Sequence, residues 1–142
     1  IAVLISLLVP AVQKVREAAA RASAFDELRP VASRVLDVVA VESDLDYALL
    51  EAERVVQDVQ DEQTVPDPEV VAAILQGLRS GEADLRAALH ALKNPASSHV
   101  PGQLEAYLEL KHSLTTLLAE IVQLKAHVGH LHKMLVPCRQ CD

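Results

Sequence analysis

The sequence predicts an all-α protein: an elongated antiparallel helical bundle of three long helices, preceded by an apolar N-terminal helix. Apolar residues recur at spacings of three and four over long segments, and no segment shows the alternation of strands. The 142 residues include only 4 glycines. Aromatic residues are limited to Phe25, Tyr47 and Tyr107, so the core must be built from aliphatic side chains and alanine, which favours closely packed helices.

The N-terminal helix is predicted over residues 1–25, and the bundle domain with a short C-terminal tail over residues 26–142. Residues 1–9 are apolar or small, and Pro10 separates them from an alanine-rich, charged helix former. Nine such residues are too few to cross a bilayer, which takes roughly 20 apolar residues.

Three long segments with helical periodicity follow. Boundaries are predicted at Arg29-Pro30, at residues 64–68 and at residues 94–102, where proline disfavours a helix in the residue before it. The first segment keeps its spacing from Val31 to Val59, with only Glu42 breaking it. The second runs from Val71 to Leu92 with a candidate kink at Ser80-Gly81, and the third covers about 33 residues from Leu104, a span of about 50 Å.

Charge is unevenly distributed along the chain. Residues 26–69 carry 13 acidic and 3 basic side chains, whereas residues 70–142 carry 6 acidic and 7 basic ones. The simplest interpretation is that acidic and basic helices face one another or water; the alternative is a C-terminal end that docks an anionic partner or lipid headgroup. The net charge of −7 and the scarcity of aromatic residues argue against nucleic-acid binding.

The first 22 residues, IAVLISLLVPAVQKVREAAARA, resemble the N-terminal helix of type IV pilin-like proteins and pseudopilins. The resemblance implies a subunit of the cell envelope, periplasmic or extracellular, that is anchored in the inner membrane and then self-associates or joins a multi-subunit assembly. Pro10 matches the family's helix-kinking proline, and residues 14–21 match the point where the helix leaves the lipid. The implied anchor and assembly residues are Ile1, Leu4, Ile5, Leu8 and Pro10.

The sequence also departs from the pilin pattern. The cleavage site, the first dozen mature residues and the glutamate that registers subunits during assembly are not found in it. Typical pilins carry a β-rich head after this helix, whereas here the head would be replaced by helices. The alternative is that residues 1–22 form one amphipathic helix of a soluble bundle.

The C-terminus holds the one candidate metal site. Cys138 and Cys141 form a CxxC pair, and His127 and His130 precede it on one helix face. Two thiolates and two imidazoles suit tetrahedral zinc, although the tail would have to fold back for all four to meet. The alternatives are a disulfide or a frayed tail. Haem attachment fails because Asp142, and not histidine, follows the second cysteine.

A polar stripe follows the last predicted helix at spacings of three and four. Glu109 and His112 within it have the ExxH spacing of di-iron bundles, but no second ExxH occurs. The stripe is either a solvated face or a seam against another subunit. Its members are Glu109, His112, Thr116, Glu120, Gln123, His127, His130 and Met134.

No catalytic motif is present: there is no nucleophile elbow, no phosphate-binding glycine loop and no HExxH. The sequence therefore predicts a non-enzymatic structural or interaction protein with protein partners and a membrane contact through the N-terminal helix. The alternative is a soluble helical-bundle binder of metal or cofactor that uses the C-terminal His and Cys residues, with zinc as the only cofactor candidate.

Overall fold

The computed structural model describes the backbone of residues 2–62, 65–95 and 100–136, and their side chains from Val9 onward. Within these ranges every regular element is a helix, so the predicted all-α class is confirmed. The helices are α1 (Ala2–Ala22), α2 (Arg29–Val38), α3 (Asp44–Gln60), α4 (Pro68–Ala91) and α5 (Gln103–Leu135).

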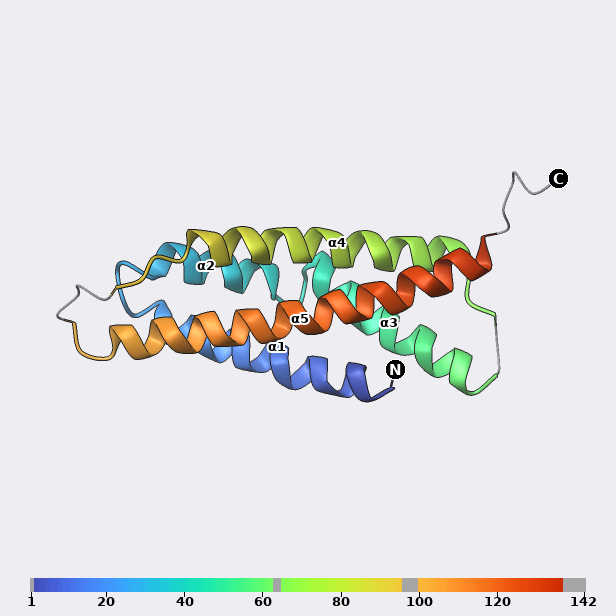
Figure 1. The fold of residues 1–142 in the computed structure, drawn as a ribbon, viewed down its shortest axis with the longest axis horizontal. Coiled ribbons are helices and arrows are strands. Elements are labelled where there is room, and N and C mark those ends of the chain that lie inside the picture. Colours follow the sequence, from blue (N-terminus) through green and yellow to red (C-terminus); the bar gives the residue numbers. More distant parts are fainter. Residues whose placement is uncertain (1, 63–64, 96–99, 137–142) are drawn as a thin grey trace.

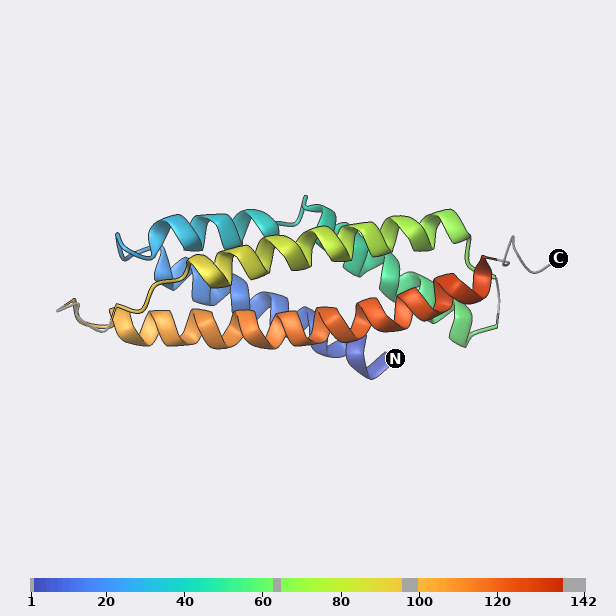
Figure 2. The ribbon, with the colours of Figure 1, turned by 45° about the horizontal axis from the view of Figure 1, so that its top comes forward.

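The helices lie side by side along one long axis (Figures 1 and 2). Helices α1 and α4 run in one direction, and α2, α3 and α5 run in the other. Helix α5 extends along most of the molecule, with α1 and α4 both packed against it. Helices α2 and α3 follow one another along the axis, so that α2 covers one half of α4 and α3 covers the other.

The single long helix predicted from Val31 to Val59 is wrong, because the chain breaks between α2 and α3. Helix α2 ends at Val38, with Val39 as its C-cap. Ser43 caps the start of α3, and its hydroxyl accepts a hydrogen bond from the Asp46 amide at 3.1 Å. Arg16 of α1 supports the break, since its Nε donates to the Val39 carbonyl at 2.7 Å. A serine cap followed by acidic residues in the first turn is a strong helix start, and it overrides the apolar spacing that runs through it.

Helix α4 begins where the sequence predicts, with Asp67 accepting a hydrogen bond from the Glu69 amide at 2.9 Å and Pro68 in the first turn. It continues without interruption through Ser80 and Gly81, the candidate kink.

Two glycines of α4 instead allow a close approach to α3. A Cβ at Gly77 would lie 2.7 Å from the Ala48 Cβ and 2.9 Å from the Asp44 carbonyl oxygen. One at Gly81 would lie 2.7 Å from the Leu45 Cδ1. The two helices can therefore pack this closely only because residues 77 and 81 have no side chain.

Helix α5 has the predicted length, 33 residues. It starts after Gly102, whose φ of 81° is a left-handed conformation that glycine adopts without strain. The buried Gln103 donates from Nε2 to the Glu27 carboxylate at 2.9 Å, which ties the start of α5 to the α1–α2 connection.

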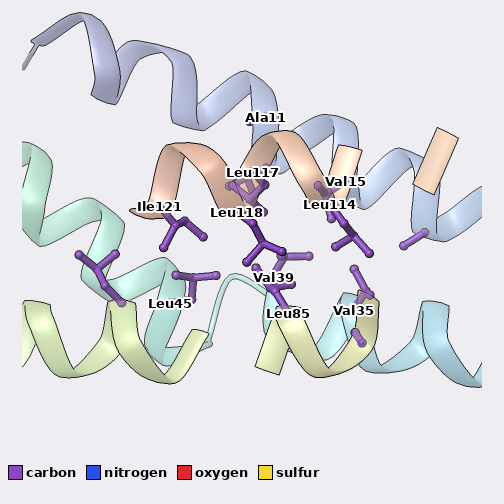
Figure 3. Packing of buried hydrophobic residues seen from close by; sticks show 14 of the residues in the cluster. Ala11, Val15, Val35, Val39, Leu45, Leu85, Leu114, Leu117, Leu118 and Ile121 are labelled. Carbon is purple, nitrogen blue, oxygen red and sulfur yellow. The ribbon is translucent and has the colours of Figure 1, made fainter. Parts of the chain in front are cut away.

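A single apolar core joins the helices. Figure 3 shows Val15 of α1, Val35 of α2, Leu85 of α4 and Leu114 of α5 directed toward one another. All four are fully buried. Leu45 of α3 belongs to the same cluster and lies further along the bundle, near Ile121 of α5, so the core is continuous across the α2–α3 break.

The two ends of the bundle are built differently. At one end, which we call the closed end, α1 and α2 lie beside α4 and α5. At the other, the open end, α3, α4 and α5 run past the start of α1 (Figures 1 and 2). The closed end comprises residues 11–39, 82–92 and 103–121, and the open end residues 52–60, 68–75 and 124–136.

Candidate functional site: an apolar groove at the open end

A groove of about 260 Å³ lies at the open end between α3 and α5. Ile74 of α4 and Leu124 of α5 are completely buried at its base. Val59 and Met134 are 41% and 71% exposed, respectively. The lining consists of Ala52, Val55, Val56, Val59, Gln60, Ile74, Leu124, His127, Val128, His130, Leu131 and Met134.

The chemistry of the groove is almost entirely apolar. Among the described residues that line it, none is acidic, a lysine or an arginine, and the polar side chains are Gln60, His127 and His130. Contiguous apolar surface of this kind marks sites that bind proteins, membranes or apolar ligands. The groove therefore suits an uncharged helix or chain segment better than a charged one.

The groove continues the position that α1 occupies in the bundle. The face of α3 around Leu49 and Leu50 meets α1 at Val9, Val12 and Arg16, across a smaller hollow of about 160 Å³. One turn further along α3, the residues from Ala52 to Gln60 meet the groove and, across it, α5. A helix in the groove would thus lie between the same two neighbours as α1.

Helix α1 passes from core to surface at its proline. Ala11 and Val12 are buried, whereas Pro10 and Val9 are exposed, Val9 by 59%. Of the predicted anchor residues, Pro10 lies within the helix. The side chains of Ile1, Leu4, Ile5 and Leu8 lie outside the described residues, so their role stays a prediction. Among the described residues, no helix combines the length and the apolar character that crossing a membrane requires.

The charged part of α1 makes contacts within the bundle. Besides its bond to Val39, Arg16 lies 3.4 Å from the Asp46 carboxylate. Arg21 lies 2.5 Å from a carboxylate oxygen of Glu109 on α5. These arginines therefore help to hold α1 on α3 and α5.

The predicted zinc ligands are only partly placed. His127 and His130 are exposed on the α5 wall of the groove, one turn apart. Cys138 and Cys141 lie outside the described residues. Within the part of the chain that is described, no three potential metal ligands gather at one place.

The predicted polar stripe of α5 is not uniformly solvated. His112, Thr116 and Gln123 are exposed. Glu120 instead has one carboxylate oxygen that is buried and has no hydrogen-bond partner among the described residues. Burial raises the pKa of Glu120 above its ordinary value, against the opposing effect of Lys14 on α1.

A second carboxylate, Glu82 of α4, is buried in the opposite electrostatic situation. It is bound by Lys125 of α5 and accepts a hydrogen bond from Arg86 Nε at 2.9 Å. The hydrogen bond from Lys125 is the main reason that the pKa of Glu82 lies below its ordinary value; burial opposes it and Arg86 adds to it. Lys125 thus serves as a link between α4 and α5.

Sequence reasoning did not identify the groove. The spacing placed Val56 and Val59 on the apolar stripe of their helix, as core, and Met134 in the polar stripe of α5. Adjacent apolar residues at 55 and 56 were the available signal, because they widen the apolar face of α3 beyond what one packing neighbour covers.

Comparison with known proteins adds no relatives: no family model, curated protein or solved structure matches the chain.

Proposed function

We propose that this chain is a non-enzymatic, pilin-like or pseudopilin-like structural subunit that is anchored or assembled through its N-terminal helix. The observation that carries the proposal is the change in α1 at Pro10. From Ala11 onward α1 contributes buried side chains to the core, whereas Val9, the last residue of the apolar run, is exposed. The run 1–9 holds seven large apolar residues and no charge, so exposing it to water would be unfavourable.

In this proposal the two parts of α1 have different roles: residues 11–22 pack in the bundle, and residues 1–9 make the external contacts. Val15, Ala18, Ala19 and Ala22 are fully buried and hold α1 in the bundle. The apolar run extends the same helix toward the open end. Association of this run with a membrane or with other subunits would leave the buried contacts of residues 11–22 in place.

The test is deletion of residues 1–9. The deletion should reduce self-association in sedimentation velocity and reduce co-flotation with phosphatidylcholine vesicles, while circular dichroism keeps its helical signal. The matched control is Val41→Lys/Leu108→Lys, which changes two exposed apolar residues outside the run and the groove. If the truncated chain matches the intact chain in both association and flotation, the proposed function is wrong.

A further inference from the structure

We propose that His127, His130 and Met134 of α5 form a binding site for copper(I). The proposal goes beyond the proposed function and does not depend on it. Histidine, cysteine and carboxylate side chains form no group of three among the described residues. The thioether of Met134 is a further kind of donor, and it completes a set of three with the two imidazoles.

The three side chains lie on one face of α5, because they follow one another at spacings of three and four residues. All of them line the groove at the open end. The outer two are separated by about 10 Å along the helix axis, and His130 lies between them. Since Cα–Cβ bonds tilt toward the N-terminus of a helix, that of Met134 is directed back toward His130. One ion beside His130 is therefore within reach of all three long side chains.

The three donors are also accessible. His127 and His130 are exposed, and Met134 is 71% exposed. Within the described ranges neither imidazole takes part in a hydrogen bond or an ion pair, so no such contact has to be broken for a metal to bind. Because the site needs one face of a single helix, it does not require the rest of the groove to be unfilled.

The donor set selects copper(I) among the common metal ions. A thioether is a soft ligand that favours Cu(I), and imidazole also binds copper, whereas Mg²⁺ and Ca²⁺ prefer oxygen donors. Structural zinc takes four ligands, usually thiolates, imidazoles or carboxylates, and Cu(I) accepts lower coordination numbers. All three donors here are neutral, and the described lining of the groove holds no carboxylate to offset a double charge. A singly charged ion is the less costly one to place against such an apolar surface.

The test is a Cu(I) titration of the full chain carrying Cys138→Ser/Cys141→Ser, which we call the reference chain. Both cysteines are replaced because thiolates bind Cu(I) by themselves. Anaerobic competition with the chelator bicinchoninate measures how much copper the chain retains and how tightly. We expect the reference chain to bind one Cu(I) and to keep it in the presence of excess Zn²⁺.

Single substitutions in the reference chain test each donor. His127→Gln, His130→Gln and Met134→Leu should each weaken Cu(I) binding by about tenfold or more, since even the outer-shell partners of metal ligands are worth roughly 10–100-fold in affinity. The matched controls are His90→Gln and His112→Gln. They remove exposed imidazoles of α4 and α5 that do not line the groove, and they should leave the affinity unchanged.

X-ray absorption at the copper edge supplies a readout that a purely structural role of Met134 would not change. Once both cysteines are replaced, Met134 is the only sulfur-bearing residue of the sequence. We expect a sulfur neighbour of copper in the loaded reference chain and none in its Met134→Leu form. Circular dichroism should show the same helix content for both.

Any of four results would overturn the proposal. The reference chain could retain no Cu(I) while the wild type does, which would assign copper binding to the cysteines. Met134→Leu could bind as tightly as the reference chain, or the absorption spectrum could lack a sulfur neighbour. Displacement of the copper by Zn²⁺ would indicate a site made of imidazoles alone.

Discussion

The closed and open ends share α4 and α5, yet the same two helices bury their apolar residues to different extents. At the closed end, where α1 and α4 pack against α5, Leu110 and Leu114 of α5 are completely buried. At the open end, Leu131 is only partly buried and Met134 is 71% exposed, although the apolar content of α5 is no lower there. Burial along α5 therefore depends on how many helices pack around it. At the open end α5 keeps the apolar composition of a core helix, but part of its apolar surface is exposed.

The largest expected effect compares one leucine from each end. Leu114→Ala should lower the free energy of unfolding by about 2–5 kcal/mol, because it opens a cavity in a sealed core. Leu131→Ala should cost only about 1 kcal/mol, because its side chain already borders the groove. Urea unfolding measures both values, provided that the slope of unfolding free energy against urea concentration is unchanged. Equal losses would show that the open end is as well packed as the closed end.

The next comparison concerns glycines on α4 and α5. Gly77→Ala should lower the free energy of unfolding by about 1–2 kcal/mol, since the new Cβ would meet Ala48 and the Asp44 backbone at under 3.0 Å. At the open end, Gly129→Ala should raise it by about 0.5–1 kcal/mol. The nearest atom, Leu75 Cδ2, lies 4.0 Å away, and alanine is the better helix former. Thermal unfolding followed by circular dichroism gives the sign of each change, and a stabilising Gly77→Ala would contradict the close α3–α4 contact.

Glu82→Gln tests the ion pair that joins α4 to α5. The pKa of Glu82 is lowered in the folded protein, so its pairing stabilises the fold above the ordinary value of 4.5 and is lost as the pH falls through the folded-state pKa. We expect Glu82→Gln to cost about 1–2 kcal/mol at pH 7. The difference from wild type should shrink in acid, as followed by urea titrations across this pH range. A loss independent of pH would indicate a packing defect instead.

Glu120→Gln should have the smallest effect and the opposite sign. The pKa of Glu120 is raised by burial, so the folded state is favoured when this carboxyl is protonated and that advantage disappears as the pH rises through its folded-state pKa. A neutral amide removes the cost of burying the charge, and we expect a gain of about 0.5 kcal/mol at pH 7. The gain should vanish below pH 4.5. A destabilised variant at neutral pH would show that the carboxylate has a partner in solution.

The sequence was sufficient for the parts of the fold that depend on local signals. Apolar spacing and proline positions predicted the all-α class, the start of α4 and the full length of α5. They failed between Val39 and Ser43, where α2 ends and a serine cap starts α3 although the apolar spacing, interrupted only at Glu42, continues on both sides.

The groove could not be predicted for a different reason. An apolar face such as that of Val55, Val56 and Val59 looks the same in sequence whether or not another helix covers it. The ion pair of Glu82 could not be predicted either, because its partner Lys125 is 43 residues away in the sequence. Of the predicted sites, the pilin-like anchor and the zinc ligands stay predictions.

The bond from Arg16 to the Val39 carbonyl makes the joint between α2 and α3 dependent on α1. If α1 detached, this carbonyl would lose its guanidinium partner, and the adjacent Asp46 would lose the cation beside it. Local opening of the N-terminal helix and loosening of the joint should then be a single cooperative event. In native-state hydrogen exchange, amides of residues 12–22 and those of the first turn of α3 would share one opening free energy, below that of the α4 and α5 interior.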